Sequence, residues 1–272
     1  MKTFLRRPGN KGKFLKHLVP LIPLDYGTYL EPFVGTGALF LHLLPSDWVI
    51  NDLNSDVFGC WELVKNDPEY LLQEIDKFKE KIIVLSNPEK LLLCKEITGE
   101  LDGYTGKRRA AFYLIMVYCS FIGCIERGGG FKFSTLYSHI YNNDSLHIFT
   151  ETYKKKVREI SLFLKNGSIL NTDYKTVLEM AKKGDFVFLD PPYVMDYAYS
   201  FSYLKKDQAF SVEDLAFECD KLDKKGVKWM MTNTDGEQTR RLFSKYKSVE
   251  YINNNSTPGR PSSKKEVIFF NY

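Results

Sequence analysis

The most specific chemical pattern in the sequence lies at 185–193. Apolar residues typical of a buried strand run into a carboxylate, two prolines and an aromatic ring: Asp190, Pro191, Pro192 and Tyr193. Adjacent prolines fix the backbone and remove two N–H donors, so the carboxylate and the nearby carbonyls remain as acceptors in set positions. Such acceptors can hold the N–H bonds of an amino group on a heterocycle and stabilise the charge that develops when its nitrogen attacks. The simpler alternative is a polar strand end followed by a rigid turn.

A second pattern lies at 29–38, where a strand runs into Gly35 and Gly37 and then into a helix. Glycines there let the backbone turn sharply and approach a ligand at the helix N-terminus. A dinucleotide fingerprint needs a third glycine at position 40, which is Phe40, so a nicotinamide cofactor is disfavoured. Asp52 ends the next strand, where an acidic side chain can bind both hydroxyls of a ribose. Taken singly the motifs also fit an ordinary turn and a helix N-cap, but together they favour a ribose ligand.

The segments around these motifs alternate as strands and helices, which is typical of an α/β fold with a mostly parallel sheet. The expected strands are 29–33, 48–52, 168–171, 185–190 and 228–233, with 249–252 and 267–272 as a terminal hairpin. The expected helices are 38–44, 55–65, 176–182, 212–224 and 236–246. Ligands in such sheets bind at the carboxyl ends of the strands, where the strand order reverses. We therefore expect strand 185–190 to lie beside strand 29–33, with both motifs facing one pocket.

The alternation breaks between about 67 and 165, where no parallel strand is expected. Segments 91–97 and 108–121 look helical, and 125–141 is rich in glycine, aromatic and polar residues, as in a loop or hairpin. The sequence thus predicts a core made of 1–60 and 165–272 and a mainly helical insertion at 61–164.

Composition limits the classes of protein that fit. The 272 residues, 44% of them hydrophobic, suffice for one large domain or a domain with an insertion. No apolar run approaches the roughly 20 residues of a membrane span, and the N-terminus lacks a signal-peptide core, so we expect a cytoplasmic protein. The five cysteines form no CxxC pair and the four histidines have no ligand spacing, so neither disulfides nor a metal is expected. A net charge of +4 is compatible with nucleic-acid binding without arguing for it.

Together these motifs resemble the amino-methyltransferase superfamily and, within it, the Dam-type DNA adenine methyltransferases. Segment 31–37 is similar to that family's cofactor motif, and 190–193 to its DPPY motif. The resemblance implies a Rossmann-like methyltransferase fold, S-adenosylmethionine as cofactor, and methylation of N6 on a flipped-out adenine in duplex DNA. The catalytic residues that it implies are Asp190, Pro191, Pro192 and Tyr193, with Tyr193 as a surface for base stacking. The cofactor contacts that it implies are Lys11, Glu31, Pro32, Phe33, Gly35, Gly37, Asp52, Asp173 and Asp190.

The same resemblance places a target-recognition domain in the insertion. Segment 123–134 occupies the recognition-hairpin region, where we expect Arg127, Phe131 and Lys132 to meet DNA. Arg127 would contact a guanine edge, and Phe131 or Phe133 would fill the space left by the flipped base. The family's Arg-x-Asn and Phe-Asn pairs are absent from this segment, so the resemblance does not carry a GATC target. A surface loop with its phenylalanines buried is the alternative.

Other functions stay open on the sequence. An amino-methyltransferase acting on RNA, cytosine N4 or a protein amide is one, although Ser or Asn more often precedes the prolines in those enzymes. An inert DNA-binding paralogue is another, although it need not keep both Asp190 and the glycines. A C5-cytosine mechanism is excluded because no cysteine follows a proline. The expected partner is duplex DNA, so the protein is expected wherever the host or viral DNA lies. A cognate restriction endonuclease as a second partner is also compatible with the sequence. No oligomeric state is predicted.

Overall fold

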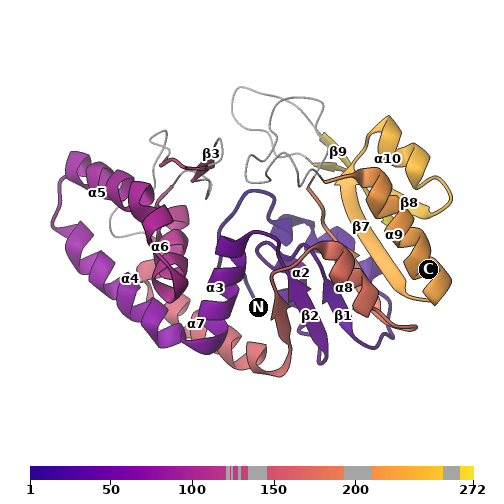
Figure 1. Ribbon diagram of the computed structural model, residues 1–272, viewed down its shortest axis with the longest axis horizontal. Helices are drawn as coiled ribbons and strands as arrows, with labels where there is room; N and C mark the ends of the chain where they lie inside the picture. Colours follow the sequence, from indigo (N-terminus) through magenta and orange to yellow (C-terminus); the bar gives the residue numbers. More distant parts are fainter. Residues whose placement is uncertain (121–122, 124, 128–129, 134–145, 193–209, 254–263) are drawn as a thin grey trace.

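A seven-stranded sheet forms the centre of the molecule (Figure 1). The computed structural model describes residues 1–120, 123, 125–127, 130–133, 146–192, 210–253 and 264–272. The strands lie in the order β5-β2-β1-β6-β7-β9-β8. Their bounds are Tyr29–Glu31 (β1), Trp48–Asn51 (β2), Ser168–Leu170 (β5), Phe186–Leu189 (β6), Lys228–Thr234 (β7), Lys247–Asn253 (β8) and Lys264–Phe270 (β9).

Strands β5, β2, β1, β6 and β7 are parallel, and β9 runs antiparallel to both β7 and β8. This confirms the predicted α/β sheet with its terminal antiparallel hairpin. The chain builds outward from β1 through β2 to β5 and then returns to place β6 on the other side of β1. The predicted neighbours are therefore adjacent, with Tyr29 paired to Phe186 and Leu30 to Val187. The order reverses between β1 and β6, where open α/β sheets bind ligands.

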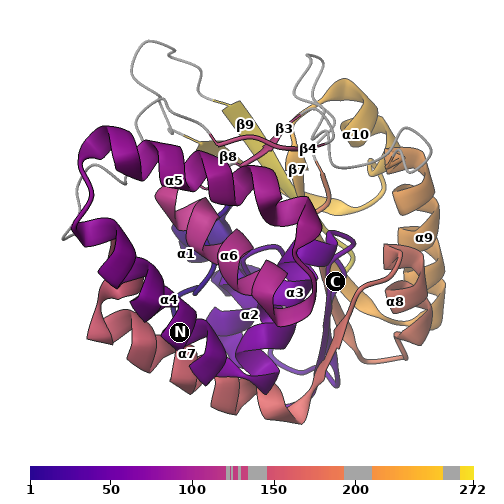
Figure 2. The ribbon, with the colours of Figure 1, turned by 60° about the vertical axis from the view of Figure 1, so that its left-hand side comes forward.

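Helices cover both faces of the sheet. Strand β6 alternates, with Phe186 and Phe188 packing into one core cluster and Val187 and Leu189 into the other. The second cluster lies under three helices, α8 (Tyr174–Met180), α9 (Val212–Lys225) and α10 (Glu237–Leu242). The first cluster takes in the N-terminal segment and the helices α1 (Leu15–Leu18), α2 (Ala38–Leu43), α3 (Ser55–Asn66), α4 (Pro68–Ile83), α5 (Asn87–Glu100), α6 (Gly106–Cys119) and α7 (Glu151–Phe163). Figure 2 shows α3 to α7 gathered on one side of the molecule.

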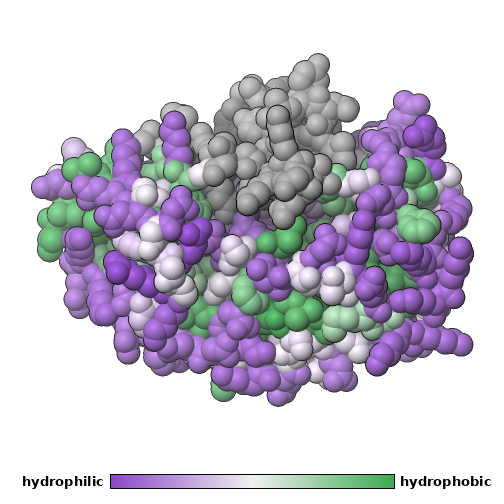
Figure 3. Space-filling model, viewed as in Figure 1, coloured by the Kyte–Doolittle hydropathy of each residue, from purple (hydrophilic) through white to green (hydrophobic). Residues whose placement is uncertain are grey.

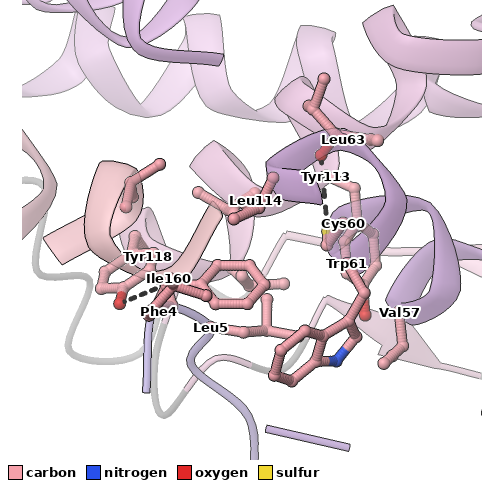
Figure 4. Packing of buried hydrophobic residues seen from close by; sticks show 14 of the residues in the cluster. Phe4, Leu5, Val57, Cys60, Trp61, Leu63, Tyr113, Leu114, Tyr118 and Ile160 are labelled. Atoms are coloured by element: carbon pink, nitrogen blue, oxygen red, sulfur yellow. Dashed lines mark hydrogen bonds between the residues drawn. The ribbon is translucent and has the colours of Figure 1, made fainter. Parts of the chain in front are cut away.

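The N-terminal residues are part of the core beneath these helices. Phe4 and Leu5 lie among side chains of α3, α6 and α7, close to Trp61 (Figure 4). The hydroxyls of Tyr118 and Tyr153 both donate to the carbonyl of Phe4, each over 2.9 Å. Helices that follow β2 in the sequence therefore fix the path of the first residues of the chain.

The sequence analysis missed the one-turn helix α1 and two longer helices, α4 and α7. Both carried ordinary start signals, because the Asp67 side chain accepts from the Tyr70 amide and the Thr150 hydroxyl accepts from the Tyr153 amide. Their buried positions also recur at helical spacing, as in Leu71, Ile75, Phe78 and Ile82. The predicted start of α8 was two residues late because Asp173 caps that helix, and the predicted end of α10 was four residues late.

The insertion also contains a two-stranded hairpin, β3 (Glu126–Arg127) and β4 (Gly130–Phe131). This confirms the loop or hairpin expected there. Within the described part of the chain, no helix is long and apolar enough to cross a membrane. Hydrophobic residues show at the middle of the face seen in Figure 3, between its helical side and the side of β7 to β9.

Gly37 closes the turn between β1 and α2 in a conformation that other residues rarely adopt. Its φ is 63°, in the left-handed region. A Cβ atom built there would lie 2.5 Å from Cζ2 of Trp61, whose indole N–H donates to the Gly35 carbonyl over 3.0 Å. The turn and the ring of Trp61 therefore leave no room for a side chain at this position.

We expect Gly37→Ala to lower the free energy of unfolding by about 2–4 kcal/mol, from left-handed backbone strain and overpacking against Trp61. Urea denaturation followed by tryptophan fluorescence measures the change. Gly99→Ala is the control, because its Cβ would meet nothing within 4 Å in α5, and it should leave stability unchanged or slightly raised. A wild-type denaturation midpoint for Gly37→Ala would contradict this account of the turn.

Candidate active site

Three carboxylates stand at the carboxyl edge of three neighbouring strands. Glu31 ends β1, Asp52 follows β2 and Asp190 follows β6. Because the sheet order is β2-β1-β6, these residues belong to one edge, at the point where the strand order reverses. The structure thus brings together the two motifs that the sequence expected to share a pocket.

Asp190 is held by two side chains that approach the same oxygen. The Lys11 ammonium lies 2.7 Å from Asp190 Oδ1, and the Thr232 hydroxyl donates to Oδ1 over 2.7 Å. Thr232 lies on β7, level with Asp190, because Leu189 pairs with Met231 in the parallel register. Both of these contacts are at Oδ1.

Lys11 reaches Asp190 from a short 3₁₀ helix, η1 (Lys11–Phe14), and is only 7% exposed. The Asn10 side chain caps this helix by accepting from the Gly12 amide over 2.7 Å. The ring of Phe14 packs edge-on against Tyr251 of β8, with centroids 4.9 Å apart. The N-terminal segment is thereby anchored on the terminal hairpin, and its lysine is directed into the edge of the sheet.

Glu31 is buried within β1, and the Tyr29 hydroxyl donates to its Oε2 over 2.7 Å. Burial raises the pKa of Glu31 well above its ordinary value, and the nearby Asp190 and Asp52 raise it further, against the lowering effects of the Tyr29 hydrogen bond and Lys11. Burial and the neighbouring carboxylates therefore favour the uncharged form of Glu31.

Asp52 ties the glycine turn to the end of β2. Its Oδ2 accepts from the Gly35 amide and its Oδ1 from the Asn54 amide, each over 2.9 Å. Gly35 has a φ of 48°, and a Cβ built there would meet nothing within 4 Å. The turn thus presents open space beside an oriented carboxylate, as a ribose site requires.

An aromatic cluster borders the same edge. The ring of Phe33 lies 5.2 Å from that of Tyr174 and 5.9 Å from that of Phe210, between centroids. The Tyr174 hydroxyl is buried and makes no hydrogen bond to any residue that the structure describes. Asp173 caps α8 by accepting from the Lys175 amide over 2.9 Å. The sequence analysis named Asp173 and missed the aromatic residue that follows it.

The expected recognition residues differ in burial, and the side chain of one of them is not among those that the structure describes. Phe131 is half-buried against α6, Lys132 is exposed, and the Lys132 amide donates to the Ile125 carbonyl. Arg127 pairs with Gly130 through the backbone, but its side chain lies outside the described residues, as does Tyr193. Pro191 and Pro192 come directly after Asp190, and Pro191 is buried. In the described part of the chain, no group of three or more His, Cys, Asp or Glu side chains is gathered as a metal site would need.

Comparison with known proteins identifies the family. The model of the D12 class N6 adenine-specific DNA methyltransferases matches residues 8–257. The chain belongs to this family. It is 30% identical over 286 residues to the type II methyltransferase M1.LlaDCHI of Lactococcus lactis, covering 100% of this chain and 96% of that protein. It is also 30% identical over 253 residues to the type II methyltransferase M.MjaIII of Methanocaldococcus jannaschii (86% and 84%), and 21% identical over 251 residues to a DNA adenine methylase of Vibrio cholerae (89% and 84%).

This chain is accordingly an adenine-specific DNA methyltransferase. The expected enzyme class and reaction are confirmed, and the alternatives of an RNA, cytosine-N4 or inert protein are not supported. Sequence reasoning did not find Tyr29 and Thr232. Tyr29 precedes Glu31 by two residues on the same strand face, a signal that was available. Thr232 contacts Asp190 only through the pairing of β6 with β7.

The raised pKa of Glu31 makes stability depend on pH. Since the folded-state pKa lies above the unfolded value, the stabilisation from the protonated carboxyl is complete below the unfolded pKa. It is lost as pH rises through the folded pKa. We expect Glu31→Gln to flatten this decline and to be more stable than the wild type at about pH 8. Thermal unfolding without cofactor across the pH range measures this, and parallel curves for the two proteins would refute it.

Proposed function

We propose that the enzyme uses S-adenosylmethionine as its methyl donor and that the Lys11–Asp190–Thr232 group binds the amino group of the target adenine. The observation that carries the proposal is this group at the end of β6, next to the glycine turn and its carboxylates. The family supplies the reaction, and the geometry of these side chains supports the proposed assignment of residues.

The residues at the ends of β1 and β2 fit the proposed cofactor. Glu31 and Asp52 are acceptors for its ammonium and ribose groups, Gly35 and Gly37 let its chain approach, and Phe33 lies against its adenine ring. Bound S-adenosylmethionine supplies a methyl group on a cationic sulfonium, a charge that the crowded carboxylates favour. Pro32 follows Glu31 directly, and its carbonyl accepts from the Asn51 side chain over 2.9 Å, which fixes the backbone between the two acceptors. Asp173 is proposed as a further contact to the cofactor.

The residues after β6 fit the target amino group. Oδ2 of Asp190 accepts one N–H, and the carbonyls of the rigid Pro191–Pro192 segment provide further acceptors. Lys11 and Thr232 orient the carboxylate through Oδ1, so it need not reorganise when the nitrogen becomes positively charged. Tyr193 is proposed as the stacking surface for the flipped base.

The insertion at 61–164 is proposed as the target-recognition domain, with core segments 1–60 and 165–272 as the catalytic domain. Arg127 and Lys132 are proposed to contact duplex DNA from the β3–β4 hairpin. The packing of Phe131 on α6 would have to break before its ring could fill the space of a flipped base. Relatives named as type II methyltransferases support a cognate restriction endonuclease as a partner of this enzyme.

The assignment of Asp190 is tested with labelled cofactor and mixed-sequence DNA, followed by nucleoside analysis. The wild type should form N6-methyladenine, and Asp190→Ala should form none while binding cofactor within about tenfold of the wild type. Thr232→Val removes one hydrogen bond to a charged group, worth about 1.5–3 kcal/mol, so turnover should fall by about 10- to 100-fold. Near-normal turnover in Asp190→Ala would overturn the assignment.

A further inference from the structure

Phe131 fastens the recognition hairpin to the first turns of α6. The guanidinium carbon of Arg109 lies 5.2 Å from the centroid of the Phe131 ring. The ring of Tyr113, one turn further along α6, lies 6.2 Å from it at 68°. Phe131 pairs with Glu126 and Gly130 with Arg127, so the position of β4 sets the backbone position of Arg127.

The guanidinium of Arg109 also binds a residue in the first turn of α3. Its Nε donates to Asp56 Oδ1 over 2.6 Å and its Nη2 to Asp56 Oδ2 over 3.2 Å, a two-pronged ion pair. Nη1 donates to the Leu101 carbonyl over 3.0 Å. Asp56 is only 8% exposed, and its hydrogen bond raises the pKa of Arg109. A bidentate pair between a half-buried arginine and a buried carboxylate fixes the direction of the guanidinium plane.

Asp56 in turn belongs to the helix start that follows the proposed ribose carboxylate. The Asp56 amide donates to the side chain of Asn54 over 2.9 Å, and the Asn54 amide donates to Asp52 Oδ1. The other oxygen of Asp52 accepts from Gly35 in the glycine turn. Hydrogen bonds and one ring contact thus connect Gly35 to Phe131 without interruption.

An open groove of about 520 Å³ lies beside the ion pair, and its lining includes Asp56, Arg109, Lys107 and Asn171. The Asn171 side chain donates to the carbonyls of Asp52 and Leu53. Helices α3 and α6 pack closely beside this groove, with the Cys60 thiol of α3 donating to the Ala110 carbonyl of α6. A change at the start of α3 is therefore passed on to α6 through packed side chains as well as through the ion pair.

We propose that Arg109 is a positioning residue that couples cofactor binding at Asp52 to the placement of the recognition hairpin. A ligand that orders Asp52 and the start of α3 holds Asp56, and Asp56 holds the guanidinium on which Phe131 rests. Occupancy of the cofactor site then favours the hairpin position that meets the DNA, and DNA binding favours the cofactor by the same factor. This inference rests on the proposed cofactor site.

The test measures the dissociation constant of S-adenosylhomocysteine by calorimetry, with and without a duplex that the wild type methylates. The ratio of the two constants is the coupling factor. It is compared in the wild type, Arg109→Gln and Phe131→Leu, with circular dichroism confirming the fold. Arg108→Gln is the matched control, because Arg108 lies on the same helix with its guanidinium carbon 4.2 Å from the centroid of the Tyr104 ring.

We expect a wild-type factor in the ordinary range of about 5 to 150, and a factor within about twofold of one in both variants. Binding of S-adenosylhomocysteine without DNA should stay within about threefold of the wild type, and the control should keep the wild-type factor. Both variants should also discriminate less between the preferred duplex and duplexes with one changed base pair.

A wild-type factor of one would overturn the inference, as would a wild-type factor in Phe131→Leu. Phe131→Leu decides the question if Arg109→Gln fails to fold, because it leaves the Arg109–Asp56 pair intact. The measurements distinguish failure of the proposed cofactor site from failure of the proposed role of Arg109. No binding of S-adenosylhomocysteine by the wild type would overturn the cofactor assignment, whereas normal methylation with unchanged coupling in the variants would overturn only the role of Arg109.

Discussion

The crowding of negative charge at one edge of the sheet is the constraint on which the rest of the structure depends. Glu31, Asp52 and Asp190 stand at the ends of adjacent strands, and burial, with a further contribution from the charges of Asp190 and Asp52, raises the pKa of Glu31. Like charges in a partly buried site cost free energy unless cations or directed donors offset them. Lys11 and Thr232 do so at Asp190, Tyr29 at Glu31, and two backbone amides at Asp52.

This constraint explains why segments far apart in the sequence must meet. The segment that carries Lys11 is held at the edge on both sides, by Phe4 and Leu5 buried against the helices that follow β2 and by Phe14 packed on the terminal hairpin. The helices after β2 therefore support the edge that holds Asp190 as well as the β3–β4 hairpin, which packs on α6 through Phe131. Loss of packing at Phe4 would displace Lys11 and leave Asp190 beside Glu31 without its cation.

The sequence predicted the parts of the site that local chemistry specifies. The glycine turn, Asp52 and the Asp190–Pro192 segment each have a pattern within a few residues, and strand order follows from the rule for open α/β sheets. Thr232 and Arg109 were missed because their roles depend on strand pairing or helix contacts that no local pattern encodes, whereas the position of Tyr29 two residues before Glu31 was a usable local signal. The helices α4 and α7 were missed although Asp67 and Thr150 gave usable capping signals. The packing of Phe131 on α6 is likewise a tertiary contact.

Proton release on cofactor binding tests the central claim most directly. Without a ligand, Glu31 keeps its proton above its ordinary pKa, and pairing with a cationic cofactor should ionise it. Calorimetric titration with S-adenosylmethionine in buffers of different ionisation enthalpy, from about pH 5 to about pH 8, measures the protons released. The wild type should release protons within this range, and Glu31→Gln should release fewer and bind more weakly. Equal proton release and equal affinity in the two proteins would contradict the account of a partly buried carboxylate site that favours a cationic ligand.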